Sequence, residues 1–395
     1  GAAVAALFAT LGMAAAEPLQ TYLTYSDDPV TTMDVNFYLE EQVPSAYVYL
    51  DTVSRGGDKE QYAQRNRADY RQTMLEIYDG RALYVAALKD LAPGTVYYFV
   101  AGEKKNGFTK ERSFRTLPGG DKPFRFVDGG DMGTDELPMK LQELAGKQDP
   151  DFAVIGGDIP YSNGHLAEFK DWEEWFANWD KYMVRNDGRM IPIVAAIGNH
   201  EVNHFKSDHP ELRSPDYLSF FGHQAETTYY SRKLGDNAVF FILDSGHIAP
   251  QNGAQTEWLA KEMEAFKDVK FKFACYHVPL YPTHRPYEGL PSQLERDNWG
   301  PLFDTYALTV GFEHHDHVFK RTKPLKGNQV VEKGTVYVGD GAFGVDPREV
   351  DNPPRWYDEK AGSIAHFWVV DVTPDTVHLK AIDENGATVD AFSLP

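Results

Sequence analysis

From Phe124 onward, short apolar runs alternate with amphipathic stretches, and this alternation limits the choice of fold more than any other feature. The apolar runs are FRFV (124–127), FAVI (152–155), PIVAAI (192–197), AVFFIL (238–243), FKFACY (271–276) and ALTV (307–310). Stretches of helical periodicity lie between several of them, at 137–147, 166–184 and 254–267. Buried strands separated by amphipathic helices are typical of a layered α/β domain. We therefore expect residues 124–395 to form one such domain, with further strands over 365–394.

The chain before this point has a different character. Its apolar runs are short and rich in β-branched and aromatic residues: MDVNFYL (33–39), SAYVYLD (45–51), ALYVAAL (82–88) and TVYYFVA (95–101). Polar turns separate them, which predicts β-strands at the spacing of a small sandwich. We expect an all-β domain over 18–117, joined to the second domain by the Pro/Gly-containing segment 118–123.

The first residues, GAAVAALFATLGMAAAEPL, combine an apolar stretch over 2–13 with the small residues Ala14, Ala15 and Ala16. This pattern resembles the apolar region and cleavage site of a secretory signal. We expect residues 1–17 to be a signal peptide, truncated at its N-terminus, and the protein to be exported to the periplasm or secreted. It would be membrane-anchored if the segment is not cleaved. No later stretch of the sequence approaches the roughly 20 apolar residues of a membrane span, so we expect no stable membrane insertion after cleavage.

The charge of the chain restricts its partners. A formal net charge of −20 at pH 7 repels nucleic acid, and we expect no nucleic acid partner. An acidic protein can still bind phosphate where metal ions supply local positive charge. The single cysteine, Cys275, excludes an intrachain disulfide and a zinc–thiolate cluster.

Five of the apolar runs are followed at once by polar residues that can bind a metal or a phosphate. These residues are Asp131, Asp158, Tyr161, Asn199, His200, His277, His315 and His317. In open α/β sheets ligands bind beyond the carboxyl ends of the strands, so we expect these side chains to meet at one edge.

The donor types suggest which ligand they share. Carboxylate, amide, phenol and imidazole donors suit first-row metals such as Fe, Zn and Mn. Leaving His200 aside, seven side chains exceed the needs of one tetrahedral site. If one carboxylate bridges, they furnish two four-ligand sites. Two metal ions a few ångströms apart can generate a hydroxide and clamp a phosphoryl group during in-line displacement.

The motifs GDMG, GDIPY, GNHE, HVPLY and HDH stand in the order and spacing of the calcineurin-like metallophosphoesterases. The GDxxY form, with Tyr161, resembles the purple acid phosphatase branch of that superfamily. The early strands, with ALKDLAPGTVYYFV and SFRTLP, resemble its fibronectin-III-like domain. The resemblance implies a layered β-sandwich flanked by helices (an αββα architecture), preceded by a small fibronectin-III-like sandwich.

The same resemblance assigns roles to the site residues. Asp131, Asp158, Tyr161 and His317 would hold Fe(III), while Asp158, Asn199, His277 and His315 would hold Fe, Zn or Mn. Asp158 would bridge the two ions, and a metal-bound hydroxide would attack phosphorus. His200 would stabilise the phosphate or protonate the leaving group. A tyrosinate on Fe(III) would give a visible charge-transfer colour.

Two regions depart from the family pattern or match it loosely. His284 and Arg285 lie where plant-type members carry a pair of substrate-facing histidines, and a guanidinium can grip phosphate. The alternative is that both are surface loop residues. In the last motif His314 replaces the usual Gly, and Phe319-Lys320 replaces Tyr-Glu. These changes next to the ligands leave the preferred metals and the pH optimum open.

We therefore expect an acid phosphatase-type hydrolase that cleaves phosphate monoesters, with a small-molecule phosphate ester as substrate. A phosphodiesterase or nucleotide phosphatase on the same dimetal centre is the nearest alternative, because the same metals serve both reactions. A non-catalytic binding module with a decayed site is the alternative from another class.

Overall fold

A computed structural model describes residues 17–395, and the expected signal segment lies outside this range except for Glu17. Within residues 17–395, no helix combines the length and the apolar composition needed to cross a bilayer.

The N-terminal part is a β-sandwich, as expected. Its elements are β1 (Leu19–Thr24), β2 (Met33–Leu39), β3 (Ala46–Asp51), η1 (Lys59–Gln61), β4 (Gln64–Arg71), α1 (Met74–Asp79), β5 (Ala82–Leu88), β6 (Val96–Glu103), β7 (Gly107–Phe108) and β8 (Arg112–Arg115). The four apolar runs read from the sequence coincide with β2, β3, β5 and β6. Strand β4, between β5 and β3 in the sheet order, escaped sequence reasoning because its side chains are mostly exposed and polar.

The second part alternates strands and helices. Its strands are β9 (Phe124–Gly129), β10 (Phe152–Ile155), β11 (Ile193–Ala195), β12 (Tyr230–Leu234), β13 (Ala238–Ile242), β14 (Phe271–Cys275), β15 (Val310–Glu313), β16 (Phe319–Thr322), β17 (Leu325–Lys326), β18 (Gln329–Val330), β19 (Val336–Gly339), β20 (Asp358–Gly362), β21 (His366–Val372), β22 (Val377–Asp383) and β23 (Thr388–Leu394). Its helices are α2 (Glu136–Gly146), η2 (Leu166–Glu168), α3 (Lys170–Tyr182), η3 (Asn199–Glu201), α4 (Pro210–Arg213), α5 (Pro215–Phe221), α6 (Ala254–Ala265), α7 (Leu290–Asn298) and α8 (Gly300–Tyr306).

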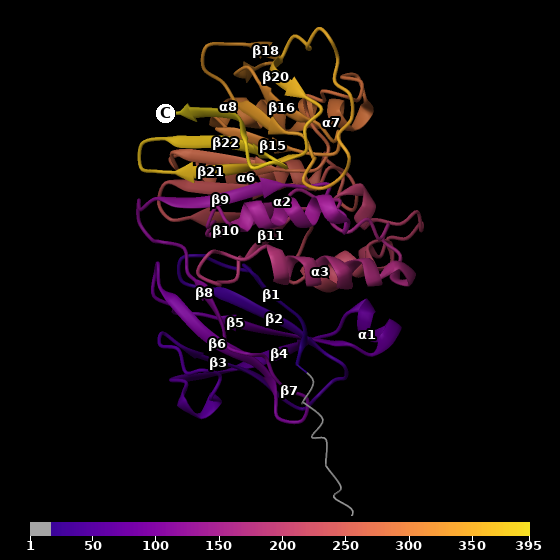
Figure 1. Cartoon of the computed structure of the whole chain (residues 1–395). Helices are drawn as coiled ribbons and strands as arrows, with labels where there is room; N and C mark the ends of the chain where they lie inside the picture. The colour runs from indigo at the N-terminus through magenta and orange to yellow at the C-terminus, as the bar shows by residue number, and fades with distance from the viewer. Residues whose placement is uncertain (1–16) are drawn as a thin grey trace, which may run out of the picture.

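Two sheets face each other in this α/β domain (Figure 1). One runs β23-β22-β21-β9-β10-β11, and the other runs β12-β13-β14-β15-β19-β16-β20. The rings of Phe126, Phe240, Phe273 and Phe312 pack between them, with centroids 5.4–6.2 Å apart. The strands are therefore buried on both faces, which explains why they read as continuous apolar runs.

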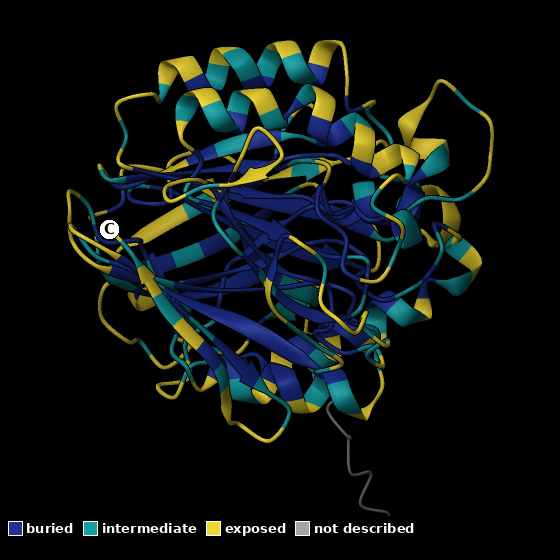
Figure 2. Cartoon of the chain, turned by 90° about the horizontal axis from the view of Figure 1, so that it is seen from above, coloured by how far each residue is buried: buried dark blue, intermediate teal, exposed yellow. Residues whose placement is uncertain are grey.

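Helices cover the outer faces, and their solvent sides carry the exposed residues (Figure 2). Helices α2, α3 and α5 contribute to the cluster that packs on the first sheet, and α6 and α8 to the cluster on the second. The tryptophans Trp172, Trp175 and Trp179 of α3 are all buried in the first of these clusters. Their helical spacing thus marks a core-facing stripe.

The two parts share a sheet. Strand β1 pairs with β2 of the β-sandwich on one side and with β11 of the α/β domain on the other, where Thr24 lies opposite Ile193. The hydroxyls of Tyr22 and Tyr38 donate to the carbonyls of Phe220 and Ser219, each at 2.6 Å. The segment 118–123 is the covalent connection from β8 to β9, but the sheet itself continues across the junction through β1.

Candidate metal centre

The candidate ligands meet where parallel strands of both sheets end. Strands β9, β10 and β11 run parallel, as do β13, β14, β15 and β19. The loops after β9, β10, β11, β14 and β15 carry all the candidate ligands: Asp131, Asp158, Tyr161, Asn199, His277, His315 and His317. The topology therefore brings together residues that are up to 186 positions apart, from Asp131 to His317.

One group of donors surrounds Nε2 of His277. That atom lies 3.0 Å from Oδ1 of Asn199, 3.1 Å from Oδ2 of Asp158 and 3.1 Å from Nδ1 of His315. The Nδ1 of His277 faces the carbonyl of Gly156 at 2.8 Å and must donate to it, so a neutral ring presents the lone pair of Nε2 to the other three donors.

A second group forms around Asp131. Its Oδ1 lies 3.0 Å from Nε2 of His317 and 3.4 Å from the hydroxyl of Tyr161, and the last two atoms are 3.3 Å apart. The other oxygen, Oδ2, accepts a hydrogen bond from the backbone N–H of His315 at 2.9 Å. Asp131 is fully buried, and its carboxylate is thus oriented by the loop that carries two histidines.

Asp158 belongs to both groups. Donor atoms of Asp158, His277 and His315 lie within 4.8 Å of one another, and so do those of Asp131, Asp158 and His317. Spacings of 3.0–3.4 Å between donors fit ligands that stand about 2 Å from a shared ion. The residues present therefore fit two metal ions, with the Asp158 carboxylate between them.

The backbone of the site is unusual. Asp131, Asp158, Tyr161, His315 and His317 all have positive φ angles, between 52° and 76°. Non-glycine residues adopt this left-handed conformation rarely, and such residues cluster at functional sites. Five of the seven candidate ligands therefore share a strained backbone that the sequence did not reveal.

The protonation of the metal-free site follows from its charges. Burial by itself would lower the pKa of His277, but Asp158 and Asp131 raise it to about 10. Burial would raise the pKa of Asp158, yet His277 holds it below its usual value. For His315, burial and the neighbouring His277 depress the pKa. A metal ion would displace the proton that Asp158 and His277 share, because only the deprotonated ring can bind it.

His200 stands at the rim, with 37% of its side chain exposed. Its Nε2 lies 4.0 Å from Oδ2 of Asp158, and its ring packs on Tyr161 with centroids 4.4 Å apart. Its Nδ1 lies 2.5 Å from Oδ1 of Asn163, whose amide Nδ2 donates to Glu168. Asn163 thus accepts the Nδ1 proton and leaves Nε2 facing the site. Sequence reasoning missed Asn163, although it stands two residues after Tyr161.

Glu201, the last residue of GNHE, is a second residue to which the sequence assigned no role. Its buried carboxylate accepts hydrogen bonds from the backbone N–H groups of Asp158, Ile159 and Gly198, at 2.7–2.8 Å. It ties the loop that carries Asp158 to the loop that carries Asn199 and His200. The sequence did carry a signal for this role, because Glu201 lies two residues after the candidate ligand Asn199 in a glycine-containing turn.

The two candidate substrate residues face other partners. The guanidinium of Arg285 donates to the carbonyl of His315 and pairs with Asp316 at 3.0 Å. The ring of His284 is exposed, and its Nδ1 lies 2.8 Å from the carbonyl of Glu349. Asp316 is buried and also accepts from the backbone N–H groups of Thr283 and His284, so it organises this loop and is not among the clustered donors.

Comparisons with known proteins agree on both parts of the chain. Residues 18–116 match the family model described as "Purple acid Phosphatase, N-terminal domain", and residues 130–319 match "Calcineurin-like phosphoesterase". The chain is 25% identical over 325 residues to "Probable purple acid phosphatase 20" of Arabidopsis thaliana, covering 78% of this chain and 71% of the relative. An uncharacterised Mycobacterium tuberculosis protein is 24% identical over 348 residues, and the chain spans 62% of its length.

Two further comparisons concern activity and fold. "Probable inactive purple acid phosphatase 27" of Arabidopsis thaliana is 25% identical over 339 residues, covering 69% of this chain and 51% of the relative. The structure of the purple acid phosphatase PPD1 from yellow lupin matches with a TM-score of 0.79 at 17% identity, over 96% of this chain and 74% of the other. The fold is thus that of the lupin enzyme.

Proposed function

The chain is a purple acid phosphatase-like metallophosphoesterase, and on this basis we propose that it hydrolyses phosphate monoesters at a two-metal centre. The observation that carries the proposal is the Asp158 carboxylate, which lies within both donor groups. A decayed binding module would be expected to lack members of this set. Here all seven donor residues are present, and donor atoms of five of them form two groups within 4.8 Å.

The metals would be divided between the two groups. Asp131, Tyr161 and His317 would hold one ion, for which we propose Fe(III), and Asn199, His277 and His315 would hold Fe, Zn or Mn. When bound, such a pair activates water near neutral pH and compensates the charge of the phosphate. A small phosphate ester is therefore the proposed substrate despite the net charge of −20.

His200 is the residue best placed to act on the substrate. Since its Nδ1 proton is donated to Asn163, its Nε2 faces the site and can hydrogen-bond a phosphoryl or leaving-group oxygen. If Nε2 is protonated, it would donate its own proton to the departing alkoxide. This is general acid catalysis, which contributes about 10²–10⁴-fold in rate. Arg285 is held by Asp316, so it would orient the His315 segment rather than grip phosphate.

The test is a side-by-side assay of the metal-loaded protein on an aryl phosphomonoester and the matching diester, from acidic to neutral pH. Faster turnover of the monoester, reduced by about 10²-fold or more in His200→Ala, supports the proposal. Preference for the diester would favour the phosphodiesterase alternative. Absence of turnover on both substrates with two ions bound would contradict an enzymatic role.

A further inference from the structure

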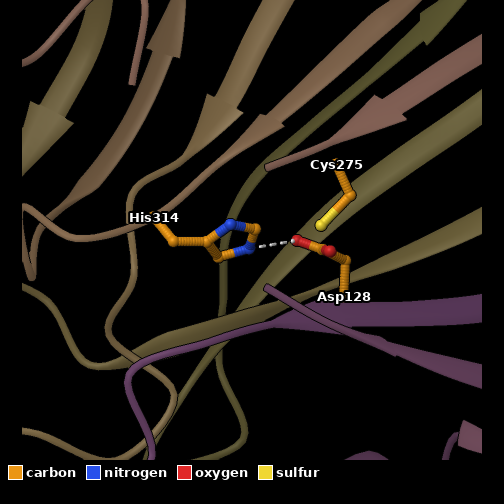
Figure 3. A group of neighbouring side chains, drawn as sticks. All are labelled: Asp128, Cys275 and His314. Carbon is orange, nitrogen blue, oxygen red and sulfur yellow. Dashed lines mark hydrogen bonds and ion pairs between the residues drawn. The ribbon is translucent and has the colours of Figure 1, made fainter. Parts of the chain in front are cut away.

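Three polar side chains lie together in the interior of the α/β domain (Figure 3). They are Asp128 at the end of β9, Cys275 at the end of β14 and His314 just after β15, and each is at most 1% exposed. Each of them lies at or within one residue of the end of its strand, and the loop that follows carries a candidate ligand: Asp131, His277 and His315 respectively. A carboxylate that is buried in the interior of a protein is costly unless it is paired.

His314 is held at both ring nitrogens. Its Nδ1 donates to the carbonyl of Tyr276 at 2.8 Å, and its Nε2 lies 3.2 Å from Oδ1 of Asp128, the contact drawn as a dashed line in Figure 3. With both nitrogens engaged, the plane of the imidazole is fixed.

The ring of His314 lies against two glycines, Gly130 and Gly156. A Cβ atom added to Gly156 would lie 2.0–2.3 Å from ring atoms of His314, and one added to Gly130 would lie 2.9 Å from its Cδ2. The ring therefore lies directly against both backbones. Gly130 precedes the ligand Asp131, and Gly156 stands two residues before Asp158. The carbonyl of Gly156 also accepts the Nδ1 proton of His277.

We propose that His314, oriented by Asp128, is a positioning residue that fixes the spacing of Asp131 and Asp158 and the orientation of His277. The inference rests on the proposed function in one respect, that these three residues bind metal. It assigns a role to His314, for which the sequence offered none. A glycine at 314 would leave both backbones without this contact.

The same three side chains include the donor types of a zinc site, and Oδ2 of Asp128 accepts no hydrogen bond from the described residues. A structural zinc ion takes four ligands and this group of described residues supplies three, so we assign the hydrogen-bonded pair of His314 and Asp128 rather than a third ion. The positioning role needs only these two residues, so Cys275 is expected to be dispensable for metal binding.

The experiment measures zinc affinity by chelator competition on the purified full chain, without reference to turnover. His314→Gly and Asp128→Leu should each weaken zinc binding by about 10- to 100-fold, the range seen when residues that orient metal ligands are removed. Asp128→Asn should stay within a few-fold of the parent, because its amide can donate to Nε2 and keep the ring in place. Should His314→Gly not fold, Asp128→Leu tests the same contact.

The matched control is His366→Gly, which also removes a buried imidazole, 2% exposed, but one whose nitrogens face the carbonyls of Ile364 and Gly339. It should lower the melting temperature as His314→Gly does and keep the zinc affinity. Equal zinc affinities in parent and His314→Gly, or equal losses in the two glycine variants, would overturn the positioning role. So would a third zinc ion that disappears in Cys275→Ala. A parent chain that binds no metal would instead refute the proposed function.

Discussion

Lys320 is fully buried, and its replacement by methionine should destabilise the protein strongly. Its ammonium group and the carboxylate of Glu313 are both fully buried and form an ion pair. The group also donates to the carbonyl of Tyr281 and lies 3.7 Å from Asp340. Burial alone would lower the pKa of Lys320, but Glu313 and Asp340 hold it above its usual value, so the lysine is charged.

The loss of stability can be estimated from the state of Glu313 in the Lys320→Met variant. Glu313 would keep its hydrogen bonds from the Tyr276 hydroxyl and the Leu280 N–H, each 2.8 Å, but would lose its counter-charge. Removing one partner of a buried ion pair costs about 3–5 kcal/mol. At roughly 2 °C per kcal/mol for a domain of this size, the melting temperature should fall by about 6–10 °C.

A double-mutant cycle separates charge from packing. In Glu313→Gln the amide oxygen can accept both hydrogen bonds, so Glu313→Gln/Lys320→Met removes both charges and should be more stable than Lys320→Met alone. Calorimetry of the metal-free proteins at one scan rate measures the four melting temperatures. A fall of less than about 2 °C in Lys320→Met, or strictly additive single effects, would refute the role assigned to the pair.

Three further predictions concern the metal centre and the core. Asp158→Ala should lose both ions together in equilibrium dialysis, and retention of two tightly bound ions would contradict the bridging assignment. In the iron-loaded protein, Tyr161→Phe should keep two ions and lose the visible charge-transfer band, so a retained band excludes Tyr161 as the iron ligand. Burial lowers the pKa of His366 to about 4, so the folded chain keeps this ring neutral while the unfolded chain takes up a proton below about pH 6.5. Stability should therefore fall by up to about 1.4 kcal/mol per pH unit between pH 6.5 and 4. His366→Asn lacks this pH-dependent loss of stability. The melting temperatures of variant and parent, measured without metal, should therefore approach each other as the pH falls.

Sequence reasoning reached the architecture because the strands are buried on both faces and read as plain apolar runs. Strand β4 was missed for the opposite reason, since its sequence QRNRADYR has no apolar alternation. The sequence also could not predict that the sheet continues from one part to the other through β1. Pairing between Thr24 and Ile193 joins residues 169 positions apart and leaves no local signal.

At the site, motif order was enough to gather the seven donors, because parallel strands end at one edge. The residues that orient these donors could not be predicted from the sequence. Glu201 and Asn163 act through backbone N–H groups and a histidine proton, which depend on the exact path of the loops. The sequence also could not show that Arg285 turns toward Asp316, because a guanidinium suits phosphate and carboxylate equally well.

The pairing of β1 with β11 makes the β-sandwich a lateral extension of the α/β domain rather than an appended module. A fragment that began at residue 124 would leave the backbone of β11 open along one edge, a ready template for intermolecular strand addition. It would also uncover the Phe220 ring, which packs against Tyr22 and Tyr38. A hinge motion between the two parts would have to break the pairing of β1 with β11.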